Sequence, residues 1–106
     1  MKYFTWGGCM KHLVIVKWNV GAEEKERLNA EALGLFKGLC GMEGIHGVEQ
    51  IKGLPLNENR FDMILKIDME KEALKAYSES AVHQKWLSEY AKYIKKKAIF
   101  DCEGDL

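Results

Sequence analysis

The sequence predicts one α+β domain, in which a four-stranded antiparallel sheet carries two helices on one of its faces. Three observations lead to this fold class. The 106 residues have room for a single hydrophobic core. Apolar residues alternate in several short runs, as in strands, and recur every three or four positions in two longer runs, as in amphipathic helices. The order of these runs is β-α-β-β-α-β, the ferredoxin-like split βαβ arrangement.

The first strand is predicted at residues 11–18, where most central residues are β-branched. Alternation divides its side chains between two faces. One face carries His12, Val14, Val16 and Trp18, and the other carries Leu13, Ile15 and Lys17. Both faces are largely apolar, whereas one helical layer covers only one of them. We therefore expect the uncovered face to be the interface of a homodimer in which two sheets pack together, and we assign Val14, Val16 and Trp18 to it.

The middle of the chain predicts a helix followed by two strands. The helix begins at about residue 23 and buries a stripe at helical spacing: Leu28, Ala32, Leu35, Phe36 and Leu39. Three glycines then end it and form a loop. A short, half-exposed strand is expected at residues 48–53 and a strand with one buried face at residues 61–68.

The last third of the chain predicts two helical segments and a final strand. Asp68 is expected to cap a short helix, and Ser80 to cap the longer helix that contains His83. The final strand is predicted at residues 98–102. We interpret the three lysines at 95–97 as helix C-terminal charge and a solvated turn.

Residues 77–94 are the one stretch in which packing and chemistry could share side chains. A helical stripe begins at His83 and continues through Trp86, Leu87, Tyr90 and Ile94. A helix that only covers a sheet more often uses Leu, Ile, Val and Ala at such positions. This stripe instead carries an imidazole, an indole and a phenol, and Tyr77 lies six residues upstream of His83. The pattern indicates a site without identifying a reaction.

Composition excludes several classes of partner. Sixteen basic and 16 acidic residues cancel, so no overall charge attracts nucleic acid or an anionic membrane. No apolar run approaches the ~20 residues of a membrane span, and the first ten residues do not resemble a secretory signal. Three widely separated cysteines fit reduced thiols in a cytoplasmic protein. Three histidines, none at ligand spacing, predict no metal site, and no motif predicts a cofactor.

The domain is expected to span residues 11–103. Residues 1–10 are interpreted as an N-terminal extension outside the core, and residues 104–106 as a loose tail. No repeat, linker or low-complexity segment divides the chain.

Five segments, in this order, make the chain similar to the stress-responsive A/B barrel (Dabb) family of dimeric α+β barrel proteins. Residues 11–18 resemble its opening Lys-His-hydrophobic strand, and residues 47–49 resemble its turn into the second strand. Residues 59–62 resemble the lead into its third strand. Residues 76–83 resemble its Tyr-x-x-His-Pro-x-His segment, and residues 99–101 resemble its last strand. Each motif is short, but their order covers nearly the whole domain.

The resemblance implies a homodimer of ferredoxin-like subunits, each with a cavity between sheet and helices. Plant members that act as polyketide cyclases use a His and a Tyr of this segment for aldol chemistry without metal or cofactor. Those positions correspond to His83 and Tyr77. Where the family commonly has His-Pro, this chain has Ser80-Ala81, so the likeness does not specify a reaction.

The candidate catalytic residues are His83, Tyr77 and His12. His83 titrates near neutral pH and could act as a general base. The Tyr77 hydroxyl could orient it or polarise a carbonyl, and His12 could add a polar group if it faces the same cavity. Trp86 and Tyr90 are expected to line the ligand pocket. The alternative is that His83 and His12 are satisfied core or interface residues, and that Tyr77 and Tyr90 bury their rings with the hydroxyls at the rim.

Three functions remain open at this point. The first is a cytoplasmic homodimer that binds a small apolar or aromatic molecule. The second is a cofactor-free enzyme, resembling a polyketide cyclase or a small monooxygenase, with His83 as base and Tyr77 as its partner. The third is a structural or stress-protective oligomer in which the cavity is only packing.

Overall fold

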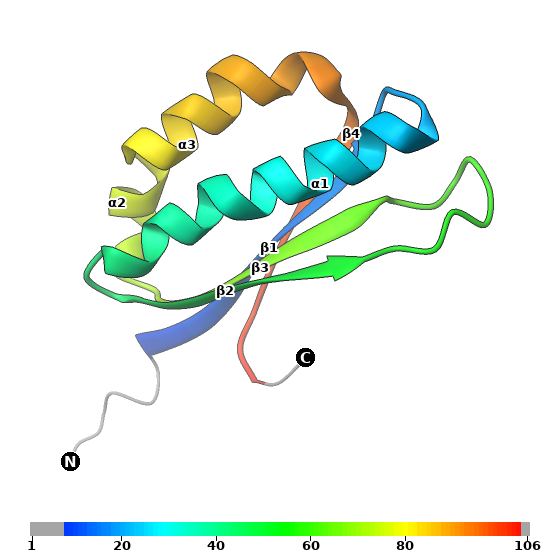
Figure 1. Cartoon of the computed structure of the whole chain (residues 1–106). Helices are drawn as coiled ribbons and strands as arrows, with labels where there is room; N and C mark the ends of the chain where they lie inside the picture. The colour runs from blue at the N-terminus through cyan, green and yellow to red at the C-terminus, as the bar shows by residue number, and fades with distance from the viewer. Residues whose placement is uncertain (1–7, 105–106) are drawn as a thin grey trace.

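The computed structural model describes residues 8–104 and confirms the predicted fold class (Figure 1). One four-stranded antiparallel sheet has the order β2-β3-β1-β4. The strands are β1 (Cys9–Trp18), β2 (Ile45–Lys52), β3 (Met63–Glu70) and β4 (Ile94–Cys102). The helices α1 (Ala22–Lys37), α2 (Ala73–Ser78) and α3 (Ala81–Lys85) lie on one face of the sheet. Short turns of other helix types follow α1 at Gly38–Gly41 and α3 at Trp86–Tyr90 and Ala91–Tyr93.

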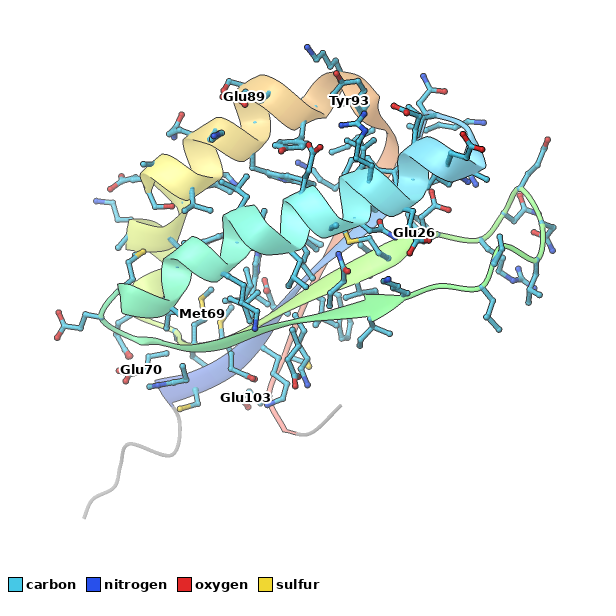
Figure 2. The ribbon with its side chains drawn as sticks, viewed as in Figure 1. Glu26, Met69, Glu70, Glu89, Tyr93 and Glu103 are labelled. Carbon is cyan, nitrogen blue, oxygen red and sulfur yellow. The ribbon has the colours of Figure 1, made fainter. Side chains whose placement is uncertain are left out.

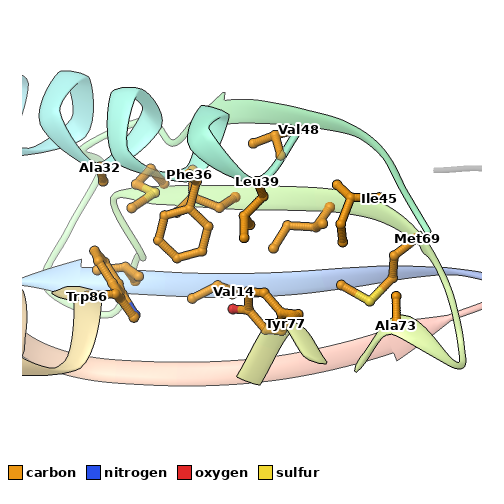
Figure 3. Close-up of a cluster of buried hydrophobic side chains, with 14 of the residues drawn as sticks. Val14, Ala32, Phe36, Leu39, Ile45, Val48, Met69, Ala73, Tyr77 and Trp86 are labelled. Atoms are coloured by element: carbon orange, nitrogen blue, oxygen red, sulfur yellow. The ribbon is translucent and has the colours of Figure 1, made fainter. Parts of the chain in front are cut away.

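The core lies between the helices and the β1–β3 pair. Leu28, Ala32 and Phe36 project from α1 as predicted and are fully buried. They meet the alternate residues of β3: Met63, Leu65, Ile67 and Met69. Side chains fill the space between the two layers (Figure 2). A close-up shows Phe36 pointing toward the sheet between Trp86 and Tyr77 (Figure 3).

The dimer-interface prediction chose the wrong face of β1. Val14, Val16 and Trp18 are 1%, 0% and 1% exposed, and they belong to the core beneath the helices. Residues with no exposed surface have nothing to offer a second subunit. Alternation correctly grouped these side chains on one face, but alternation alone does not say which face the helices cover.

The open face of the sheet carries the other set of β1 side chains. Leu13 and Ile15 of β1 are the Cα partners of Phe100 and Ala98 in β4, so the four side chains share this face. Across the sheet, Ile15 pairs with Ile64, which pairs with Ile51. Ile51 and Phe100 are 48% and 53% exposed. The uncovered apolar face is therefore present, on the opposite side from the one assigned to it.

Several predicted boundaries shift. β4 begins at Ile94 rather than residue 98, so the three lysines lie in a strand and not at a helix end. Charged residues are common on edge strands, where they discourage pairing with another chain. Asp68 is inside β3 and pairs with Lys11 of β1 at 3.0 Å, so it does not cap a helix.

The N-terminal boundary also moves. β1 begins at Cys9, and Met10 is a core residue, so residues 9 and 10 belong to the domain. Residues 1–7 and 105–106 lie outside the described residues, and the predictions for them stay predictions. None of the described helices is long and apolar enough to span a membrane.

Candidate functional site

Ser80 forms the junction that places two candidate residues next to each other. Its hydroxyl donates a hydrogen bond to the Tyr77 carbonyl at 2.6 Å. The same oxygen accepts one from the His83 backbone N–H at 3.1 Å, as the predicted N-cap of α3 should. One serine thus links the last turn of α2 to the first turn of α3.

The Tyr77 ring lies between two imidazoles. Its centroid is 5.2 Å from the ring of His12 on β1 and 5.0 Å from the ring of His83 on α3. Phe36 of α1 is 6.5 Å away and closes the inner side. Tyr77 is 2% exposed. The three predicted catalytic residues, which come from three different elements, therefore form one cluster.

The hydrogen bond of His83 determines its tautomer. Its Nδ1 lies 3.0 Å from the Ser78 carbonyl oxygen. A carbonyl only accepts hydrogen bonds, so Nδ1 carries the proton, and in the neutral ring Nε2 keeps the lone pair. Among residues 8–104, no group forms a hydrogen bond with Nε2.

The surroundings of His83 favour its neutral form. Partial burial lowers its pKa from the ordinary 6.5, and the positive charges of Lys97 and His12 lower it further. The bond to Ser78 acts in the opposite direction and is outweighed. His83 is therefore a neutral imidazole with a free nitrogen at neutral pH, which is the state a general base requires.

The surroundings of Tyr77 favour the protonated form of its hydroxyl. Burial raises the pKa of its hydroxyl well above the ordinary 10, and the negative charge of Asp101 raises it further. The hydroxyl therefore stays protonated and can only act as a donor or a neutral acceptor. Within the described part of the chain, no group forms a hydrogen bond with it.

His12 is held by a carboxylate that the sequence did not bring forward. His12 Nδ1 is 2.5 Å from Asp101 Oδ1, and the two residues are Cα partners across β1 and β4. A carboxylate accepts, so Nδ1 donates and the orientation of the ring is fixed. The only sequence signal for Asp101 was its place in the last strand, which has no meaning until the strand register is known.

The cluster lies beside the uncovered edge of the sheet. Ile99 of β4 is the Cα partner of Val14 and shares its helix-facing side, yet Ile99 is 49% exposed while Val14 is 1% exposed. The helical layer therefore covers β1 and stops short of β4. The cluster therefore lies next to a strand whose helix-facing residue Ile99 is exposed.

The two predicted pocket residues differ from each other. Trp86 is 1% exposed and packs edge-on against Phe36 and Trp18, at centroid distances of 5.2 and 6.0 Å. It is a core residue, and its assignment to the pocket lining was wrong. Tyr90 stacks on Trp86 at 5.6 Å, is half-buried, and donates its hydroxyl to Glu31 at 3.1 Å. Its contact with a ligand stays a prediction.

Within residues 8–104, no group of three His, Cys, Asp or Glu residues is placed to hold a metal ion.

Comparisons with known proteins identify the fold. No protein-family model matches the chain, and no curated protein matches it. A dimeric ferredoxin-like protein of unknown function from Bacteroides fragilis is 21% identical, with a TM-score of 0.77 over 96% of this chain and 100% of that one. A Dabb family protein from Mesorhizobium loti is 16% identical, with a TM-score of 0.71 over 93% and 98%.

A third solved structure has an assigned activity. It is the hydroxynitrile lyase of Passiflora edulis, which is 8% identical, with a TM-score of 0.70 over 93% of this chain and 95% of that one. These likenesses confirm the predicted Dabb-like, ferredoxin-like fold. At such identities, they show the fold alone, and the fold hosts more than one function.

Proposed function

We propose that this chain forms a homodimer of the Dabb type, and that its site binds a small carbonyl compound and moves a proton without a cofactor. His83 is the base, Tyr77 the hydrogen-bond donor, and His12 with Asp101 the polar wall beside them. The observation that carries the proposal is the position of the Tyr77 ring, between two imidazoles whose Nδ1 atoms are both engaged.

The protonation states fit abstraction of a proton next to a carbonyl group. His83 Nε2 takes the proton as the C–H bond breaks, and the electron pair moves onto the carbonyl oxygen. The Tyr77 hydroxyl, kept protonated by burial, donates a hydrogen bond to that oxygen. The resulting enolate can add to a second carbonyl or take the proton back. The groups of the cluster are sufficient for each of these transfers.

A first test is independent of the substrate. Nitrogen-15 NMR of the histidine rings distinguishes the two tautomers. We expect His83 to be the Nδ1–H form with a pKa below the ordinary 6.5. A neutral His83 ring protonated on Nε2 would carry its lone pair on Nδ1, beside the Ser78 carbonyl, and Nε2 could not accept the proton as proposed.

A second test measures proton transfer directly. Exchange of the α-protons of phenylacetone in D₂O is followed by proton NMR, with and without the protein. Removing a general base typically costs 10²- to 10⁴-fold, so His83→Gln should lose the acceleration, and Tyr77→Phe should lose a large part of it. His46→Gln is the matched control and should exchange as the wild type does. Equal rates in the His83 and His46 variants would contradict the mechanism.

The homodimer is supported by the open sheet face and by the dimeric ferredoxin-like proteins of similar structure. Its test is Ile15→Glu, which places a carboxylate in the middle of that face. Analytical ultracentrifugation should give a dimer for the wild type and a monomer for this variant. Leu87→Glu, at a 42% exposed site outside the sheet, should remain a dimer.

Binding without turnover is the second candidate function. The observation that favours it is Ile99, an apolar side chain that is half exposed beside the cluster and ready to contact an apolar or aromatic ligand. Under this hypothesis, a ligand shifts the Ile99 methyl resonances, while His83→Gln changes no rate. A structural or stress-protective oligomer would show neither a ligand-induced shift of Ile99 nor any acceleration of exchange.

A further inference from the structure

Strand β4 presents a row of three side chains to the helix side of the sheet. Lys97, Ile99 and Asp101 are the Cα partners of three residues on the helix-facing side of β1, namely Val16, Val14 and His12. Directly opposite residues of an antiparallel pair share a face. The row therefore runs along β4 beside the cluster, with about 7 Å between successive members.

The members of the row differ in what they can still bind. The carboxylate of Asp101 is already engaged by His12. Ile99 offers apolar surface. Lys97 is exposed, and no carboxylate among residues 8–104 forms an ion pair with it. The row thus combines a satisfied anion, an apolar surface and a cation that is available to a ligand.

Lys97 is also close enough to the cluster to act on it. Its charge is one of the causes that lower the pKa of His83. The register places Lys97 four positions from Asp101 along β4, at the end of the row away from His12. Lys96, the neighbouring residue, is the Cα partner of Lys17, so it lies on the opposite face of the sheet.

From this arrangement we infer that the ligand of the site carries a carboxylate, and that Lys97 is the residue that binds it. The substrate class is a carbonyl compound with an apolar or aromatic body over Ile99 and a carboxylate at Lys97. This inference rests on the proposed function, since it concerns the same site. An edge-strand lysine that serves only to discourage strand pairing is the competing explanation, and it predicts no difference between Lys97 and Lys96.

The test is a comparison of two probes that differ in charge, 4-acetylbenzoate and its neutral analogue 4-acetylbenzamide. Calorimetry and NMR titration give their dissociation constants for the full-length wild type and for Lys97→Met and Lys96→Met. An exposed ion pair contributes up to about fivefold in affinity, so the wild type should prefer the acid by about that factor. Lys97→Met should lose the preference, and Lys96→Met should keep it. The Ile99 methyl group should shift on binding, and Ile51, on the open face, should not.

Three results would overturn the inference. They are equal affinities for the two probes in the wild type, a preference that survives in Lys97→Met, and no binding of either probe at millimolar concentration. Both lysine exchanges remove one charge from an exposed position, so circular dichroism should show both variants folded.

These outcomes are separate from those of the proposed function, because binding is measured without turnover. A Lys97-dependent preference in a protein that accelerates no exchange would refute the catalytic proposal and leave the carboxylate site. Acceleration of exchange that requires His83, without any preference for the acid, would refute the carboxylate site and leave the catalytic proposal.

Discussion

Replacing Ser80 with alanine removes the hydroxyl that joins Tyr77 to His83. In the folded chain, that hydroxyl donates at 2.6 Å to the Tyr77 carbonyl and accepts at 3.1 Å from the His83 N–H. The alanine variant loses both bonds, and the first N–H groups of α3 lose their side-chain cap. The perturbation is local, because Ser80 is not a core residue.

The expected loss of stability follows from the N-cap. Replacing a serine N-cap with alanine costs about 1 kcal/mol, with a range of about 0.5–2. In a domain of this size, that loss lowers Tm by about 4–8 °C. Ser80→Asp keeps an acceptor for the His83 N–H but has no hydroxyl hydrogen for the Tyr77 carbonyl. Its stability should therefore fall between those of the wild type and the alanine variant.

The assay is thermal and urea unfolding, followed by circular dichroism at one fixed protein concentration, because a dimer makes Tm depend on concentration. Ser88→Ala is the matched control, since the Ser88 hydroxyl makes only a 3.4 Å contact with the Lys85 carbonyl on an exposed turn. This control should stay within about 0.5 kcal/mol of the wild type. If Ser80→Ala is no less stable than Ser88→Ala, Ser80 does not hold the junction. A smaller Nδ1–H population of His83 in Ser80→Ala would show that the junction also positions the ring.

Three other predictions follow from the described contacts. The pKa of His83 is lowered on folding, so the unfolded chain takes up a proton at a higher pH than the folded chain does. The free energy of unfolding should therefore fall as the pH drops below about 6.5, and it should fall less in His83→Gln. Lys97→Met should raise the pKa of His83 in an NMR titration. Asn29→Ala leaves the buried Trp18 indole N–H, now 2.7 Å from Asn29 Oδ1, without its partner, and should cost about 1–3 kcal/mol in urea unfolding. Gly44 has φ +84°, so Gly44→Ala should cost at least about 1 kcal/mol, and an unchanged urea midpoint would contradict this.

Patterns within single elements were sufficient to predict the order of the strands and helices and the Ser80 cap. These patterns failed to predict which face of a strand is buried, because that depends on how another element packs against it. β1 has two apolar faces, and only tertiary packing decides which one meets the helices. A usable signal was present: the face assigned to the helices also holds Lys17, whose long side chain can reach the rim of an open face. The other face holds Trp18, which needs a buried partner for its N–H and finds Asn29.

The candidate site shows the same division. Tyr77 and His83 are near each other in sequence, so the helical pattern could bring them forward together. His12 and Asp101 are 89 positions apart and become neighbours only through the β1–β4 register. Lys97 was interpreted as part of a helix end, because three consecutive lysines suit a helix C-terminus as well as an exposed strand.

The position of the cluster follows from the ratio of helices to strands. Two helical rows cover the inner strands β1 and β3, where the facing side chains are fully buried, and they leave the edge strand β4 without cover. Polar groups deep under the helices would be out of reach of ligands, whereas those on β4 alone would be fully hydrated and would interact only weakly. At the boundary between the two, Tyr77 is buried enough to keep its proton and His83 open enough to exchange one. Acid–base chemistry in this fold is therefore best supported beside β4, where burial changes within the distance between two neighbouring strands.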